Sequence, residues 1–206
     1  MTTESDPDAE LLDRLAEAIA HEAAFSGWTR GAMRDAADKI GAGDDVRRLF
    51  PGGPTDVLVH LSDRADQRTV EALDREGAEL KVRDRIKLGV KLRILNTVGG
   101  KESVRRGLAL LAIPFNGPLA FRMLYRTTDA IWHAAGDKST DFNFYSKRAI
   151  LGGVFSSTVL YWLNDRSEDD KGTWDFLDRR IDDVMRFEKF KSDVTSWGDR
   201  RSAERR

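Results

Sequence analysis

Apolar residues recur at helical spacing along most of the chain, and the alternating pattern typical of strands is absent. In the first such stretch, Leu11, Leu15, Ala18 and Ile19 fall on one face of a helix. The whole pattern predicts helices over residues 8–25, 29–39, 44–49, 54–76, 82–98, 101–112, 115–134, 141–163, 173–187 and 187–197. The sequence therefore predicts an all-α protein.

Capping residues and chain breaks divide these helices into groups. Thr29 is placed to cap the second helix, and Gly41 is placed to end it. The stretch "FPGGP" interrupts the chain, and its last residue, Pro54, suits the first turn of a helix. Thr173 is expected to cap the helix after the "DKG" loop. We expect a three-helix unit at residues 1–50, a larger helical domain at 51–186 and a C-terminal segment at 187–206.

Composition excludes several kinds of site and of membrane attachment. The 206 residues carry a net charge of −1, which gives no general attraction to nucleic acid or membrane. Cysteine is absent, which excludes disulfides and thiolate sites. The acidic first ten residues lack the features of a secretory or transit signal, and the apolar run from Ile150 to Leu163 is too short to span a bilayer. We expect a protein of the bacterial cytoplasm, either soluble or attached at the periphery of the inner membrane.

Nothing in the sequence requires an enzyme. Glu17 with His21, and Asp129 with His133, have helical metal-ligand spacing, but neither pair has a further partner in the sequence. The stretch "GGKES" at 99–103 lacks the upstream glycine and strand of a phosphate loop. No nucleophile elbow or dinucleotide fingerprint is present. We therefore expect no catalytic residue, no metal and no cofactor.

The first three predicted helices resemble the helix-turn-helix unit of TetR regulators. A DNA-binding role would make Asp44 to Phe50 the recognition helix, and its two acids would then face phosphates. Arg47 and Arg48 are its only bases, and "FPGGP" replaces the aromatic-rich close of TetR proteins. These residues favour a packing unit without a DNA role.

The segment "DFNFYSKR" at 141–148 has an unusual spacing of aromatic residues. Phe142, Phe144 and Tyr145 fall within four residues, so on a helix they point in different directions and cannot share one core stripe. The charged residues around them are Asp137, Asp141, Lys147 and Arg148. Exposed aromatics among charges are typical of a protein-binding hot spot, whereas aromatics packed under neighbouring helices would have no such role. The residues alone leave both interpretations open.

The longer context of this segment is more specific. "IWHAAGDKSTDFNFYSKRAILGGVFSSTVLYWLND" and the following "TWDFLDRRIDDVM" closely resemble the Coq-nine family of accessory proteins in ubiquinone (coenzyme Q) biosynthesis. "LFPGGPTDVLVHL" and "LAIPFNGPLAF" also fit, so the resemblance extends over roughly residues 20 to 190. It implies a TetR-like fold, binding of isoprenoid lipid in the larger domain, and association with the di-iron demethoxyubiquinone hydroxylase.

The resemblance also implies which residues meet the hydroxylase. They would be Asp137, Asp141, Asn143, Phe144, Tyr145 and Arg148. The family usually has tryptophan at the position of Phe144, and phenylalanine keeps the apolar anchor but loses the indole donor. The lipid, an isoprenoid or a ubiquinone precursor, needs an apolar slot between helices. Its expected lining is Phe121, Leu124, Ile131, Trp132, Gly152, Gly153, Phe155, Ser156, Val159 and Trp162. Ordinary close packing of helices is the alternative reading of these residues.

Two further segments have the composition of membrane-binding surfaces. In the tail, Phe187, Phe190, Val194 and Trp197 share one helix face, with Lys191 among the flanking bases. Such a stripe either lies in a membrane interface or docks back on the protein's own core. The six bases between Lys81 and Arg93 indicate either a solvated helix face or attraction to anionic lipid.

Together these patterns favour a non-catalytic accessory protein that presents a ubiquinone precursor to the hydroxylase at a membrane surface. The alternative is a TetR-type transcriptional regulator that senses a hydrophobic ligand. Homodimerisation is an expectation by analogy with TetR-like proteins only.

Overall fold

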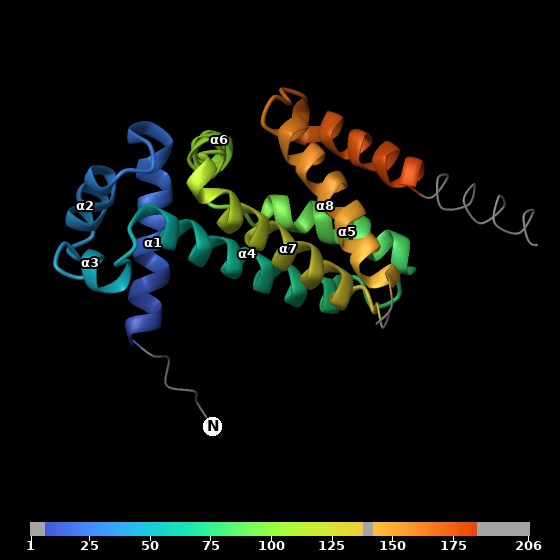
Figure 1. Cartoon of the computed structure of the whole chain (residues 1–206), viewed down its shortest axis with the longest axis horizontal. Helices are drawn as coiled ribbons and strands as arrows, with labels where there is room; N and C mark the ends of the chain where they lie inside the picture. Colours follow the sequence, from blue (N-terminus) through green and yellow to red (C-terminus); the bar gives the residue numbers. More distant parts are fainter. Residues whose placement is uncertain (1–6, 138–141, 185–206) are drawn as a thin grey trace, which may run out of the picture.

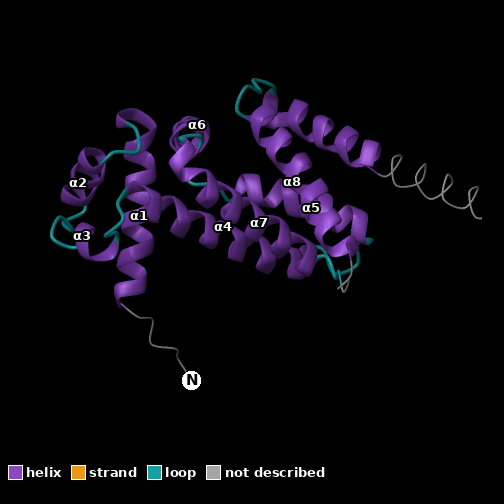
Figure 2. Ribbon diagram, in the orientation of Figure 1, coloured by secondary structure: helices purple, strands orange, loops and turns teal. Residues whose placement is uncertain are grey.

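The computed structural model describes residues 7–137 and 142–184. Its helices are α1 (Pro7–Ser26), α2 (Arg30–Lys39), α3 (Val46–Leu49), α4 (Pro54–Glu76), α5 (Val82–Leu95), α6 (Gly100–Leu111), α7 (Gly117–Ala134), α8 (Phe142–Trp162), the short 3-10 helices η1 (Pro114–Asn116) and η2 (Glu168–Asp170), and a last helix over residues 171–184. Within these residues there is no strand (Figure 2). The predicted all-α class is confirmed.

Most predicted helix boundaries lie within two residues of the observed ones. The helix expected at 82–98 ends earlier, at Leu95, because the chain turns through Asn96 and reaches Gly99 with φ 81°. The helix expected at 115–134 is divided into η1 and α7. The helix expected at 187–197 lies outside the described residues.

Two capping predictions have opposite outcomes. Thr29 caps α2 as expected, because its hydroxyl oxygen accepts the Ala32 amide at 3.1 Å. The predicted Thr173 cap is wrong: Thr173 is buried inside the last helix, and its amide and hydroxyl both donate to Asp165 at 2.6 Å. These bonds and those from Ser167 hold the pKa of Asp165 well below its usual range.

The helices form two packed groups (Figure 1). The helices α1, α2 and α3 lie together at one end, and their buried residues form one core with Val57 of α4. The second core joins α5, α7, α8 and the last helix, and Ile131, Leu151 and Leu177 are among its buried residues. The long helices α4 and α7 pack side by side between the two ends. Trp28 adds a link, because its indole N–H donates to the Ser103 carbonyl of α6 at 2.9 Å.

A charged pair lies where α4, α5 and α7 meet. Arg93 of α5 donates through Nε to Asp66 of α4 at 2.5 Å and through its terminal nitrogen to Ser62 at 2.9 Å. Thr127 of α7 donates to the same Asp66 carboxylate at 2.9 Å. Burial raises the pKa of Asp66, and Arg93 and Thr127 oppose that rise. One carboxylate therefore connects three helices inside the protein.

Gly89 lets α5 approach its neighbours closely. A Cβ atom at this position would lie 2.8 Å from Ile131 Cγ2 and 3.1 Å from Leu73 Cδ1. The first distance is shorter than van der Waals contact allows, and both atoms belong to fully buried side chains of α7 and α4. The close packing of α5 therefore requires glycine here.

The basic stretch from Lys81 to Arg93 faces partners within the protein. Arg83 pairs with Asp182 and Lys87 pairs with Asp178, both on the last helix. Lys91 lies over the ring of Trp174, 5.1 Å from its centroid. Three of the six bases are thus used to hold the helix over residues 171–184 against α5, so the stretch is not simply a solvated face.

We expect Asp66→Ala to lower the free energy of unfolding by about 3–5 kcal/mol, because Arg93 would stay buried without its partner. Urea unfolding followed by circular dichroism measures this loss. Asp74→Ala, at an exposed position on the same helix, is the matched control and is expected to change stability by less than about 0.5 kcal/mol. Equal stability of the two variants would contradict the structural role of the pair.

Candidate functional site

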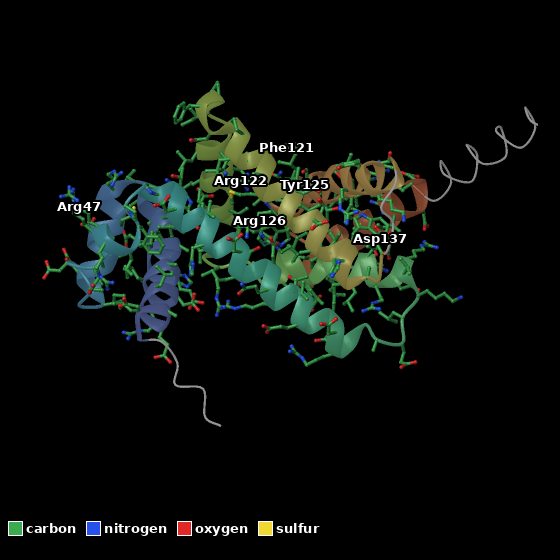
Figure 3. The ribbon with its side chains drawn as sticks, turned by 60° about the horizontal axis from the view of Figure 1, so that its bottom comes forward. Arg47, Phe121, Arg122, Tyr125, Arg126 and Asp137 are labelled. Atoms are coloured by element: carbon green, nitrogen blue, oxygen red, sulfur yellow. The ribbon has the colours of Figure 1, made fainter. Side chains whose placement is uncertain are left out.

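The candidate partner-binding patch lies where α7 ends and α8 begins. Arg148 is only 4% exposed, and its guanidinium contacts Asp129 at 2.6 Å and Asp137 at 3.3 Å. Asp137 follows the C-terminal end of α7, and its side chain is 5% exposed (Figure 3). Because a buried charge is stable only when it is paired, these contacts fix the junction of the two helices.

A second set of contacts reinforces the same junction. Lys147 donates to Asp137 at 2.8 Å and lies 5.4 Å from the ring centroid of Trp132. The indole N–H of Trp132 donates to the Lys147 carbonyl at 3.0 Å. The side chains of Trp132 and Lys147 therefore bind α7 to the first turns of α8. We call Asp129, Trp132, Asp137, Lys147 and Arg148 the junction network.

Tyr145 lies on α8 beside this network and is 66% exposed. Tyr145 is thus an exposed aromatic residue, and the following turn of α8 is held in place by the ion pairs of the buried Arg148. Of the other expected patch residues, Asp141 lies outside the described residues, and the side chains of Asn143 and Phe144 are not described either. The structure brings Asp137 and Arg148 together but places both beneath the surface, so they support Tyr145 rather than share its exposure.

The ten residues expected to line a lipid slot are distributed over different environments. Ile131 and Trp162 are buried in the second core, and Trp132, Phe155 and Val159 are packed against it. Gly152 is buried against Leu124, whose side chain lies 3.6 Å from the position of an added Cβ. Ser156 is half-buried and Gly153 faces open space. Phe121 stands apart, since it is 71% exposed on α7 (Figure 3).

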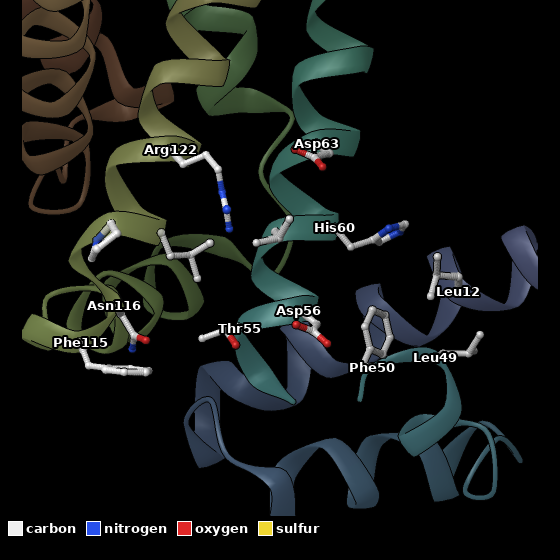
Figure 4. A pocket seen from close by; sticks show the side chains of 13 residues that line it. Leu12, Leu49, Phe50, Thr55, Asp56, His60, Asp63, Phe115, Asn116 and Arg122 are labelled. Carbon is white, nitrogen blue, oxygen red and sulfur yellow. The ribbon is translucent and has the colours of Figure 1, made fainter. Parts of the chain in front are cut away.

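Two pockets occupy other parts of the surface. The first has a volume of about 730 Å³ and lies between the three-helix end and the start of α7 (Figure 4). The second, of about 330 Å³, lies between α4 and α7 beside Asp66 and Arg126. Neither is lined by any of the ten expected lipid-binding residues. Sequence reasoning did not indicate the first pocket, because its walls come from five separate elements, α1, α3, α4, η1 and α7.

In each histidine–acid pair considered as metal ligands, the acidic residue is paired with an arginine. Glu17 pairs with Arg68 at 2.9 Å, and Asp129 pairs with Arg148. In the described part of the chain, no group of three or more histidine or acidic residues is placed to hold a metal ion. Lys101 of the "GGKES" stretch contacts the Asp165 carbonyl at 2.8 Å and Asp170 at 2.5 Å, which gives it a structural role.

The surface that would meet DNA in a TetR-type regulator is small. The helix α3 has only four residues, and Arg48 pairs there with Asp8 and Asp45, both at 2.8 Å. Arg47 is exposed (Figure 3). One of the two bases of this helix is therefore already neutralised by carboxylates, which weakens attraction to phosphates.

Two observations concern membranes. In residues 7–137 and 142–184, no single helix has the length and apolar character to cross a bilayer. The helix α6 and the segment from Pro114 to Ala134 together have that length and apolar character, but they meet at a bend of 94°. The expected membrane-binding residues Phe187, Phe190, Lys191, Val194 and Trp197 lie outside the described residues.

We expect Arg148→Gln to lower the free energy of unfolding by about 3 kcal/mol, because it removes the guanidinium from the buried carboxylate of Asp137. Tyr145→Ala is the comparison variant at the surface, and its expected loss is below about 1 kcal/mol. Thermal and urea unfolding of the two variants provide the measurement. If Arg148→Gln were as stable as Tyr145→Ala, the junction network would not hold α7 to α8.

Comparison with known proteins identifies relatives of the chain. A family model described as COQ9 matches residues 117–188, which include α7, α8 and the last helix. The ubiquinone biosynthesis protein COQ9, mitochondrial, of Rattus norvegicus is 30% identical over 200 residues, which are 93% of this chain and 64% of that protein. The Homo sapiens protein of the same name is 28% identical over 93% of this chain and 63% of its own length. The chain thus spans less than two thirds of the length of these relatives.

A solved structure has a similar fold. The crystal structure of a TetR transcriptional regulator from Nitrosomonas europaea matches with a TM-score of 0.69 and 20% sequence identity, over 84% of this chain and 96% of that one. At this identity the match concerns the fold alone, and it confirms the predicted TetR-like architecture. The sequence resemblance is confirmed as well: the chain is similar to the COQ9 proteins and has a TetR-like fold.

Proposed function

We propose that this chain is a non-catalytic accessory protein of ubiquinone biosynthesis, which binds an isoprenoid lipid or ubiquinone precursor and presents it to the di-iron demethoxyubiquinone hydroxylase. The names of its COQ9 relatives support the pathway. The observation that carries the partner role is the exposed Tyr145 above the buried junction network, inside the segment that matches the COQ9 model. The iron and the chemistry belong to the hydroxylase in this proposal.

The geometry of the patch suits recognition of a protein partner. Tyrosine offers a large apolar ring with a polar tip and has few rotatable bonds, so it loses little entropy when a partner covers it. The ion pairs of Arg148 with Asp129 and Asp137 position the α8 backbone before the partner arrives. A preorganised anchor binds more tightly than a mobile one, because less ordering remains to be done on binding.

The lipid role rests on the apolar packing between α7 and α8. Gly152 leaves this part of α8 without side-chain bulk next to Leu124 and Thr128 of α7. Neither pocket described above opens at Gly152. We therefore propose that an isoprenoid tail enters by separating α7 from α8 locally, with the segment 187–206 holding the protein at the membrane surface.

The alternative function, a TetR-type regulator, has less support. The structural match shows only the fold, and the short α3 offers Arg47 as its exposed base while Arg48 is paired. A regulator needs a basic surface that follows the DNA backbone. A gel-shift assay at low salt with the protein's own promoter region separates the two functions.

We expect Tyr145→Ala to weaken binding to the hydroxylase by roughly thirtyfold, because loss of a hot-spot aromatic costs about 2 kcal/mol and each 1.4 kcal/mol is about a tenfold change in affinity. Biolayer interferometry with the purified hydroxylase measures the change. Phe25→Ala removes another exposed aromatic, on α1, and is the matched control with unchanged affinity expected. Equal affinities for Tyr145→Ala and the wild type would place the interface elsewhere.

We expect the full chain, purified with the hydroxylase, to carry an isoprenoid lipid that native mass spectrometry identifies. Gly152→Leu adds a side chain that lies against Leu124 between α7 and α8, where an added Cβ would be 3.6 Å from the Leu124 side chain. If the tail enters there, this variant retains less lipid than the wild type, and circular dichroism checks that its helix content is unchanged. Absence of isoprenoid lipid from the wild-type complex would remove the basis of the presentation role.

A further inference from the structure

The pocket between the three-helix end and α7 combines apolar side chains with an exposed arginine that has no partner among the described residues. Its walls come from α1, the end of α3, the first half of α4, and η1 with the start of α7. The apolar side chains that line it are Leu12, Leu49, Phe50, Val59, Phe115 and Leu119. Its volume of about 730 Å³ falls in the range of roughly 300–1,000 Å³ that small-molecule sites occupy.

Most polar groups at this pocket are already satisfied. Asp63 pairs with Arg126 at 3.0 Å, and His60 hydrogen-bonds Asp13 at 2.7 Å. Asp56 accepts the Gly52 amide at 2.5 Å and lies in the first turn of α4, where the positive end of the helix dipole offsets its charge. Asp63 is therefore neutralised by a cation, whereas Asp56 keeps its charge and is held by a backbone amide at the start of α4.

Arg122 differs from them. It is exposed to solvent, and its side chain points from α7 into the space that faces α4 (Figure 4). Among the residues that the structure describes, no carboxylate, carbonyl or hydroxyl contacts its guanidinium. The guanidinium presents a fork of N–H donors that fits two oxygens of a carboxylate or phosphate. The hydroxyl of Thr55 lines the same pocket and is a further donor.

We propose that this pocket binds an anionic amphiphile, with its carboxylate or phosphate head on Arg122 and its apolar body against Leu119, Val59 and Phe50. The charge of Arg122 selects the head, and the apolar walls select the tail. Such a ligand would contact α1 and α3 on one side and α7 on the other, so it would join the two ends of the protein. This site is separate from the slot proposed for the isoprenoid lipid and does not depend on that function.

Isothermal titration calorimetry of the full chain with decanoate and with decyl phosphate, both below their micelle concentrations, tests the proposal. We expect Arg122→Gln to weaken binding of the anion by about tenfold, since a charge-assisted bidentate contact is lost. Arg14→Gln, at an exposed position on α1 outside the pocket, is the matched control and should bind like the wild type. Decanol, with a neutral head, should bind the wild type and Arg122→Gln equally.

A second variant tests the apolar part. Leu119→Trp fills the pocket and should abolish binding of both anions, with unchanged helix content by circular dichroism. Native mass spectrometry of the same variant should show unchanged isoprenoid lipid, which separates this site from the slot between α7 and α8. If Arg122→Gln binds decanoate and decyl phosphate as the wild type does, or if neither binds the wild type, the proposal is wrong.

Discussion

The buried contact between Asp66 and Arg93 is the constraint on which the arrangement of the long helices depends. Both charges lie at the crossing of α4, α5 and α7, and each is about one-tenth exposed. A buried ion pair adds little to stability compared with apolar packing, yet an alternative packing that separates the two charges is strongly disfavoured. Thr127 on α7 completes the contact, so the relative position of three helices is specified by one carboxylate. The pair therefore selects one arrangement among those that the apolar faces alone would allow.

The helices themselves could be predicted from the sequence because helix formation follows local rules. Periodicity located α4 to the residue, and the hydroxyl of Thr29 caps α2 as its position before the helix indicated. The error at Thr173 has a non-local cause. Asp165, eight residues earlier, folds back to accept its amide and hydroxyl, which the pattern within the helix does not reveal.

The candidate site was only partly predictable for the same reason. The sequence placed Asp137, Tyr145 and Arg148 in one patch but did not separate the buried residues from the exposed one. Burial of Arg148 depends on Asp129, which is nineteen positions away on another helix. The pocket at Arg122 was not predicted at all, because residues from α1 to α7 meet there only after folding. The sequence alone does not show whether a charged residue will contact water, a ligand or a residue of another helix.

Gly89 and Arg93 are one helical turn apart on α5, and they therefore face the same neighbours. The missing side chain at Gly89 brings the α5 backbone against Ile131 and Leu73, and this approach sets how far the Arg93 side chain must reach to meet Asp66. Any larger residue at position 89 acts as a spacer, and it would lift the guanidinium away from its carboxylate without altering either charge. In this protein the glycine that lets α5 approach its neighbours and the arginine that pairs with Asp66 therefore lie on the same short stretch of backbone.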